Sequence, residues 1–181
     1  MSTILDFGKH QGKSLVATVF SDPAWYRWAL DRGVFRDRGG QPLHTEAGVI
    51  WLKARNIRTP QRFPHHWQVA YYFQGWSHKF VGLSVVADAR YEEHADVRKV
   101  LDLGYVCESG CRDGLGNKLL TRAIKRVLFG EKTKVTSKML EALFADAANF
   151  DLPSSDHERR TDTTTVYDPV SPSSANTVPF S

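Results

Sequence analysis

Two apolar runs joined by a four-residue connector place the strongest constraint on the fold of this chain. Residues 66–74 and 79–88 are rich in β-branched and aromatic side chains, and Gly-Trp-Ser-His separates them. In the first run apolar side chains alternate with polar ones, which is typical of a strand covered on one face. Residues 80–87 are more uniformly apolar, which favours a central strand. The pattern predicts an antiparallel hairpin, and residues 97–107 offer a third strand.

Helical signals lie on both sides of this hairpin. Asp22 or Ser21 can cap a helix that begins at Pro23 and ends near Gly33. Residues 34–42 are glycine-rich and are predicted to form a loop, after which a second helix starts at Thr45. Residues 115–129 and a segment starting at Thr136 or at the next residue repeat apolar side chains every three or four positions. Two further helices are therefore expected after the sheet.

These elements predict an α+β fold in three parts. Residues 1–60 form a small module of a turn plus helices, and residues 61–150 form a hairpin or three-stranded sheet packed by two helices. The two parts can share one core, since 41% of the chain is hydrophobic. Residues 151–181 are rich in Ser, Thr, Pro and acidic side chains without any period, which predicts a disordered tail.

The early run FGKHQGKSL forms a glycine-lysine bend between two short apolar segments. Gly8 and Gly12 tolerate positive φ at no steric cost and let the main chain approach a ligand closely. Lys9, His10 and Lys13 surround this bend with positive charge. Exposed amides and cations in a tight bend suit a phosphate group, although a solvated hairpin tip has the same composition.

The bend and the following segment DPAWYRWAL together resemble the small C-terminal domain of exodeoxyribonuclease X-like proteins. That domain combines an FGK-x-x-GK-x-L turn with a helix carrying Tyr-Leu-x-Trp, and it also occurs alone in phage and bacterial proteins. Trp25 and Trp28 stand at the Tyr and Trp positions of this helix. The match covers about residues 4–33. It implies an accessory role in nucleic-acid binding, and it leaves the later residues unassigned.

Charge is distributed unevenly along the chain. Residues 151–181 hold five acidic and two basic side chains, so the other 150 residues carry a formal charge of +7 against +4 for the whole chain. The densest basic patch covers the penultimate helix and the loop after it: Arg112, Lys118, Arg122, Lys125, Arg126, Lys132, Lys134 and Lys138. Such a patch favours an anionic partner. The acidic tail is a candidate competitor for it.

Aromatic side chains add a possible base-stacking contact. Trp25 in the first helix and Trp76 at the predicted hairpin tip are the candidates for this contact. Trp28 lies on the same helix, and its spacing indicates a core position. The aromatic hairpin is alternatively an interface for a protein partner.

Catalysis has weaker support. Asp88, Glu92, Glu93 and Asp96 follow the second strand and are the one carboxylate cluster that suits a metal-dependent nuclease. No Walker loop, dinucleotide fingerprint or nucleophile elbow is present. The single C-x3-C pair, Cys107 and Cys111, is poor evidence for a zinc site. No cofactor or metal is therefore expected.

The sequence is best interpreted as a non-enzymatic nucleic-acid-binding accessory protein of phage or bacterial DNA metabolism, with DNA favoured over RNA. The alternatives are a small metal-dependent nuclease, or an interaction or inhibitory module that targets an acidic partner. The chain contains only two cysteines, and it has neither a signal-peptide pattern nor an 18-residue apolar run. A reduced, cytoplasmic location without a membrane partner is therefore expected.

Overall fold

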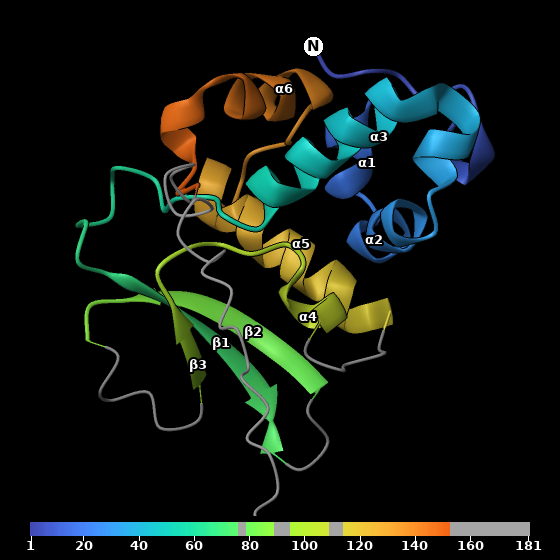
Figure 1. Ribbon diagram of the computed structural model, residues 1–181. Coiled ribbons are helices and arrows are strands. Elements are labelled where there is room, and N and C mark those ends of the chain that lie inside the picture. The colour runs from blue at the N-terminus through green and yellow to red at the C-terminus, as the bar shows by residue number, and fades with distance from the viewer. Residues whose placement is uncertain (76–78, 89–94, 109–113, 153–181) are drawn as a thin grey trace, which may run out of the picture.

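A three-stranded antiparallel sheet and six α-helices make up the described part of the chain, residues 1–75, 79–88, 95–108 and 114–152 of this computed structural model. The helices are α1 (Leu15–Val19), α2 (Pro23–Asp31), α3 (Val34–Ala54), α4 (Tyr105–Glu108), α5 (Gly114–Phe129) and α6 (Ser137–Ala145), and the strands are β1 (Gln68–Gln74), β2 (Lys79–Val86) and β3 (Ala95–Arg98). In Figure 1, α5 runs between the sheet and a layer formed by α1, α2, α3 and α6. The α+β prediction is confirmed.

Two helices begin at the predicted caps. The Asp22 side chain accepts a hydrogen bond of 3.0 Å from a first-turn N–H of α2, and Pro23 occupies the first turn. The Thr136 hydroxyl caps α6 in the same way at 3.3 Å. Each cap satisfies a backbone donor that the helix itself leaves unpaired. Gly33 follows α2 with a φ of 70°, a conformation that glycine adopts without strain.

The predicted loop over residues 34–42 is wrong, because these residues are helical apart from Gly40. They form the first part of α3, which bends at Gly40, where φ is 73° and ψ is −175°. Phe35 is fully buried and attaches this first part to the core. Pro42 lies in the first turn after the bend, where a missing N–H costs no helical hydrogen bond. Burial of the apolar residues thus overrides the loop-forming composition.

The strand order is β2-β1-β3, so the expectation that the second run is central is also wrong. β1 is the middle strand: Tyr71 pairs with Leu83 of β2 on one side and with Asp96 of β3 on the other. α5 packs against β2, while Val81 of β2 is 55% exposed. A third strand is present at Ala95–Arg98, but most of the predicted range 97–107 is wrong, because the chain leaves the sheet after Arg98 and forms α4 from Tyr105.

A single cluster of buried hydrophobic side chains runs from Leu5 to Phe150. Ile57, just after α3, is central to it: its N–H donates to Leu101 O at 3.1 Å and its C=O accepts from Leu101 N–H at 2.7 Å. Ile57 also bridges to Phe150. The end of the first predicted module therefore pairs both with the segment after β3 and with the segment that follows α6.

Trp28 was expected in the core, but half of its surface is exposed. The buried face of α2 is formed by Pro23, Tyr26 and Ala29, which are also spaced by three residues. The spacing of apolar residues in α2 is thus compatible with burying either of two faces of the helix. The face with Tyr26 is the buried one, and there the Tyr26 hydroxyl donates a hydrogen bond to Ala47 O at 3.1 Å. The predicted disordered tail lies, from residue 153, outside the described residues.

Candidate nucleic-acid interface

The glycine-lysine bend closes through its own backbone. Leu5 N–H donates to Lys13 O at 2.9 Å, and Gly12 N–H donates to Leu5 O at 2.8 Å. Gly8 and Gly12 have φ values of 66° and 81°, so both occupy the left-handed region that glycine favours. A 3-10 turn, η1 (Gly8–His10), lies between them. The bend is thus a rigid loop held against α1.

The first half of the bend is fastened to the start of α2. Lys9 Nζ lies 2.7 Å from Asp22 Oδ2, and His10 Nε2 lies 3.3 Å from the same oxygen. Burial lowers the pKa of His10, which is only 6% exposed, although the hydrogen bond to Asp22 opposes this shift. The pKa of Asp22 lies below its ordinary value: burial opposes this, but the hydrogen bonds from Lys9 and from Trp25 N–H outweigh it. Lys9 and His10 therefore already have an acidic partner.

Trp25 belongs to the same joint. Its ring centroid lies 4.7 Å from that of His10 and 6.0 Å from that of Phe35, and Lys9 Nζ lies 6.0 Å from it. The side chain is half-buried. These contacts give Trp25 a packing role between the bend and α2. Trp76, the other stacking candidate, lies outside the described residues.

The second half of the bend faces a depression. A hollow of about 620 Å³ lies between α5 and residues 130–135, and a second of about 560 Å³ lies between the bend, α5 and the start of α6. Both are lined by Ser21, Lys125 and Val135, so the two hollows adjoin at these residues. We call the two together the cationic groove; its basic lining residues are Lys13, Lys118, Arg122, Lys125, Arg126 and Lys138.

Most of this charge has no acidic partner within the described chain. The groove contains two carboxylates. Glu131 pairs with Arg126. Glu141 accepts hydrogen bonds from Ser2 N–H at 2.8 Å, Ser2 Oγ at 2.6 Å and Ser14 Oγ at 2.6 Å, which, against the effect of burial, keep its pKa below the ordinary value. The other five cations of the groove form no ion pair with any described carboxylate.

Lys125 lies where the two hollows meet. It is half-buried, and its Nζ lies 5.9 Å from the ring centroid of Phe20, which is fully buried at this point. Burial lowers the pKa of Lys125, and the charge of Lys13 lowers it further. Two cations from segments far apart in sequence thus repel each other here, and a bound anion would relieve that repulsion.

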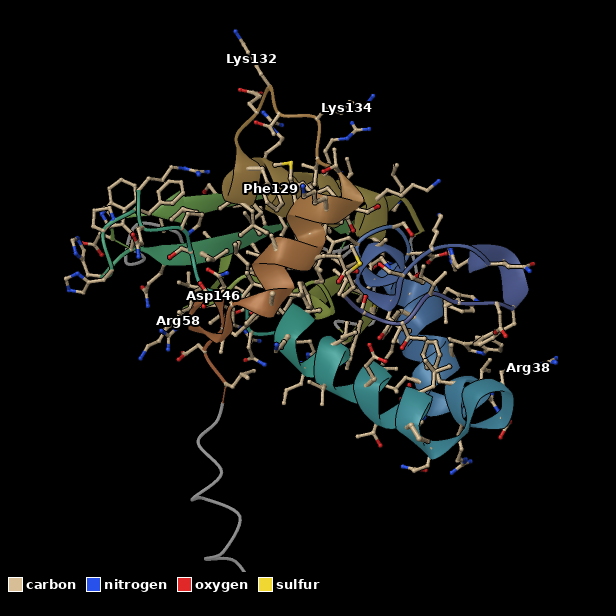
Figure 2. All side chains as sticks on the ribbon, turned by 90° about the horizontal axis from the view of Figure 1, so that it is seen from above. Arg38, Arg58, Phe129, Lys132, Lys134 and Asp146 are labelled. Atoms are coloured by element: carbon tan, nitrogen blue, oxygen red, sulfur yellow. The ribbon has the colours of Figure 1, made fainter. Side chains whose placement is uncertain are left out.

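The remaining predicted cations lie around this groove or outside the described chain. Lys132 and Lys134 project from the loop between α5 and α6, residues of which line the groove (Figure 2). Arg112 belongs to an undescribed segment. Arg38 and Arg58 lie on other sides of the molecule, as the same view shows.

The carboxylates proposed for a nuclease do not form a described cluster. Asp88 is half-buried and already has an interaction partner. Asp96 accepts a hydrogen bond of 3.0 Å from Arg98 on the same strand, and its pKa lies below the ordinary value although burial opposes this. Glu92 and Glu93 lie outside the described residues. Among those that are described, no three His, Cys, Asp or Glu side chains are grouped to hold a metal ion.

Cys107 is a free thiol packed near α5. Its Sγ donates to Asn117 Oδ1 at 3.1 Å, and burial raises the pKa of the thiol to about 12. A thiol in this state is a poor nucleophile and a poor metal ligand at neutral pH. Its sequence neighbour Cys111 lies outside the described residues.

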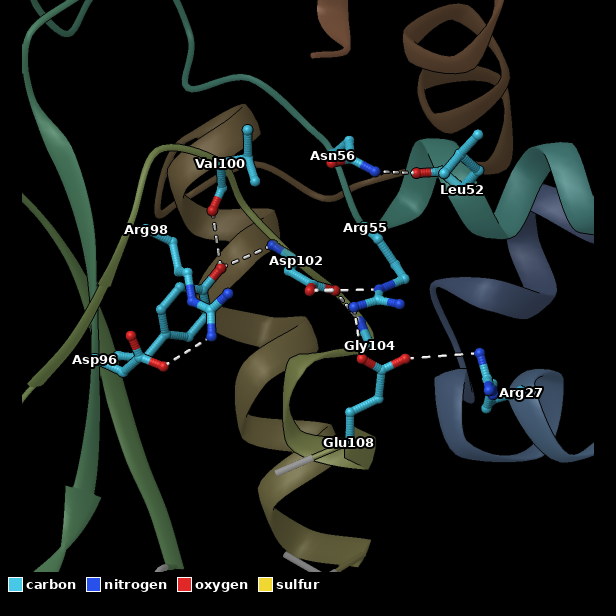
Figure 3. Close-up of polar contacts among 11 residues, drawn as sticks. Arg27, Leu52, Arg55, Asn56, Asp96, Arg98, Val100, Asp102, Gly104 and Glu108 are labelled. Atoms are coloured by element: carbon cyan, nitrogen blue, oxygen red, sulfur yellow. Dashed lines mark hydrogen bonds and ion pairs between the residues drawn. The ribbon is translucent and has the colours of Figure 1, made fainter. Parts of the chain in front are cut away.

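Sequence reasoning missed a polar network, centred on the buried Asp102, that joins α3, α4 and α2 (Figure 3). Asp102 Oδ2 lies 3.5 Å from Arg55 Nε, and Asp102 Oδ1 accepts from Gly104 N–H at 2.7 Å. This contact between Arg55 Nε and Asp102 is an ion pair without the geometry of a hydrogen bond, so the buried Nε–H of Arg55 has no acceptor. Arg55 also pairs with Glu108 at 2.5 Å, and Glu108 lies 3.6 Å from Arg27. Burial raises the pKa of Asp102 to about 6, although the charge of Arg55 opposes this.

These side chains line neither hollow of the cationic groove. The network instead fixes how the chain packs as it leaves the sheet: Asp102 N–H donates to the Tyr71 hydroxyl at 2.7 Å, and that hydroxyl donates to Val100 O at 3.1 Å. An acidic residue between the two leucines of Leu-Asp-Leu was the available signal in the sequence. We assign it a structural role.

The helices of the described chain include none with the length and apolar character needed to cross a bilayer. No family model, curated protein or solved structure matches this chain. Its function must therefore be argued from the cationic groove itself.

Proposed function

We propose that this chain binds nucleic acid, without catalysis, by holding phosphates in the cationic groove. The supporting observation is that two adjoining hollows share Lys125 and collect basic side chains from the early bend, from α5 and from α6. Cations that are far apart would each attract separate small anions, whereas cations that line adjoining hollows can bind successive phosphates of one nucleic-acid strand.

The roles within the bend differ on this proposal. Lys13 lines the groove and has no described acidic partner, so it is assigned to phosphate contact. Lys9 is paired with Asp22 and, with His10 and Trp25, holds the bend in place. The first lysine of the motif is thus assigned to positioning and the second to binding.

The likeness of residues 4–33 to the exodeoxyribonuclease X-like C-terminal domain supports the same assignment, since that likeness implies nucleic-acid binding as an accessory activity. We place the protein in phage or bacterial DNA metabolism on this basis, acting in the cytoplasm. The geometry offers no described metal cluster for the nuclease alternative.

Fluorescence anisotropy across a salt series tests the proposal. Five cations that line the groove have no acidic partner among the described residues, so the slope of log affinity against log salt should be about −4.5 for duplex DNA. Arg122→Glu removes one exposed groove cation, and it should make the slope shallower by about 1 and weaken binding to every sequence alike.

Arg38→Glu is the matched control, because Arg38 is an exposed arginine on another side of the molecule (Figure 2). This variant changes the net charge equally but should preserve the slope. If both variants weaken binding to the same extent, net charge rather than the groove is responsible, and the proposal is wrong.

A further inference from the structure

We infer that the groove takes a double-stranded nucleic acid and contacts its backbone independently of base sequence. This inference rests on the function proposed above and adds the class of ligand to it. It follows from the kinds of side chain that line the groove and from those that are missing there.

Among its described residues, the groove offers unpaired bases no exposed aromatic side chain on which to stack. Phe20 is the one aromatic residue in the described lining, and it is fully buried beneath Lys125. Trp25 is packed in the joint of the bend, and no residue of α2, including the exposed Trp28, lines either hollow. Proteins that bind single strands rely on aromatic platforms for successive bases. A single strand would gain only its phosphate contacts here.

The lining is also poorly equipped to distinguish bases. Neither hollow has an asparagine or a glutamine among its described lining residues, and one of the two arginines, Arg126, is paired with Glu131. Bidentate side chains of these types make most of the contacts that specify a base. Lysines instead bind phosphates, which are the same in every sequence. Binding should therefore be nearly independent of sequence.

The higher charge density of a duplex favours it over a single strand as the ligand of the groove. Lys118, Arg122 and Lys125 are spaced one turn apart along α5, and Lys13 and Lys138 lie in the adjoining hollow. The salt dependence per contact is about −0.9 for duplex DNA and about −0.7 for a single strand. Over five contacts this difference favours the duplex on the order of tenfold at about 50 mM salt.

The test compares one labelled oligonucleotide of about 16 nucleotides as a single strand, as a DNA duplex and as an RNA duplex, with a second unrelated sequence in each form. We expect either duplex to bind the full chain about tenfold more tightly than the single strand at about 50 mM salt. The two sequences should agree within about threefold, well below the discrimination that a bidentate base contact provides. The DNA and RNA arms identify which duplex is preferred.

Equal or tighter binding of the single strand would overturn the inference, and so would a preference between the two sequences greater than that between duplex and single strand. Arg122→Glu separates this failure from failure of the proposed function. If the single strand binds more tightly and Arg122→Glu still weakens it, the groove binds nucleic acid but the ligand class is wrong. If Arg122→Glu changes nothing, the proposed function fails as well.

Discussion

Replacing Asp102 by asparagine should make the protein progressively more stable than the wild type as the pH rises from 4 to 7. Asp102 is 8% exposed, and burial raises its pKa to about 6, compared with an ordinary value of 3.8. The charge of Arg55 and the hydrogen bond from Gly104 N–H oppose this shift without cancelling it. The ionised carboxylate is therefore less favourable in the folded protein than in the unfolded chain.

The sign follows from the order of the two pKa values. Because the folded protein holds the proton of Asp102 more tightly, this contribution to stability is complete below pH 3.8 and is lost as the pH rises through 6. Each tenfold difference in proton affinity corresponds to about 1.4 kcal/mol, so the loss amounts to about 3 kcal/mol at neutral pH. Asparagine does not titrate, and Asp102→Asn should escape this loss.

Urea unfolding of both proteins at several pH values between 4 and 8, followed by tryptophan fluorescence, measures this effect. Only the difference between the two curves is informative, because the pKa values of Asp22, Asp96 and Glu141 are lowered and make stability fall at low pH in both proteins. Any fixed cost of placing an amide beside Arg55 also leaves the shape of the difference curve unchanged.

Asp31→Asn is a suitable control, since Asp31 is an exposed carboxylate paired with Arg27 at 2.7 Å. Its difference curve should stay flat within about 0.5 kcal/mol, as is typical of surface ion pairs. A flat curve for Asp102→Asn, or a curve that falls with pH, would mean that Arg55 keeps Asp102 ionised in the folded protein. The reasoning about burial would then be wrong.

Two further substitutions test the packing of the fold. Gly104→Ala should lower the free energy of unfolding by about 1–3 kcal/mol, because the new Cβ would lie 2.8 Å from a ring carbon of Trp51. Gly48→Ala is the matched control: its Cβ meets no atom within 4 Å, so it should stabilise α3 by about 0.5–1 kcal/mol. Equal urea midpoints for the two variants would contradict this reasoning. Asp22→Ala should lower stability by about 1–2 kcal/mol through loss of the α2 cap, and an unchanged midpoint would show that neither the cap nor the two basic partners from the bend matter.

Local signals in the sequence predicted the parts of the fold that depend on neighbouring residues. Asp22 and Thr136 were identified as caps because a short polar side chain before an apolar period can satisfy free N–H groups whatever the rest of the chain does. The hairpin was predicted for a similar reason, since β1 and β2 are consecutive and antiparallel. Both features need only a few adjacent residues.

Features that depend on distant partners were not predictable in the same way. The middle position of β1 follows from its pairing with β3, and the pattern within the β1 run gives no information about that partner. Trp28 and Tyr26 fit an amphipathic helix equally well, and only packing against Ala47 selects Tyr26 for burial. The pairing of Asp102 with Arg55 likewise joins residues 47 positions apart.

The candidate groove lies between these two cases. The cations of α5 were identifiable as a one-signed run, and Lys13 was identifiable from the glycine-lysine bend. Their meeting at Lys125 was not, because it depends on how α1 and α6, which lie far apart in the sequence, pack against each other. The neutralisation of Lys9 was also hidden, although Asp22 had been recognised as a helix cap; the same carboxylate performs both tasks.

The hydrogen bonds of Glu141 join the two ends of the described chain. Ser2 and Ser14, at the beginning of the chain, reach their final partners only when α6 is in place. The hairpin strands, by contrast, find each other across a short connection. Closing such distant contacts carries a large loop entropy and slows folding. The bend itself closes through local backbone hydrogen bonds. We therefore expect its attachment to α6, and with it one wall of the groove, to form later than the bend and the hairpin.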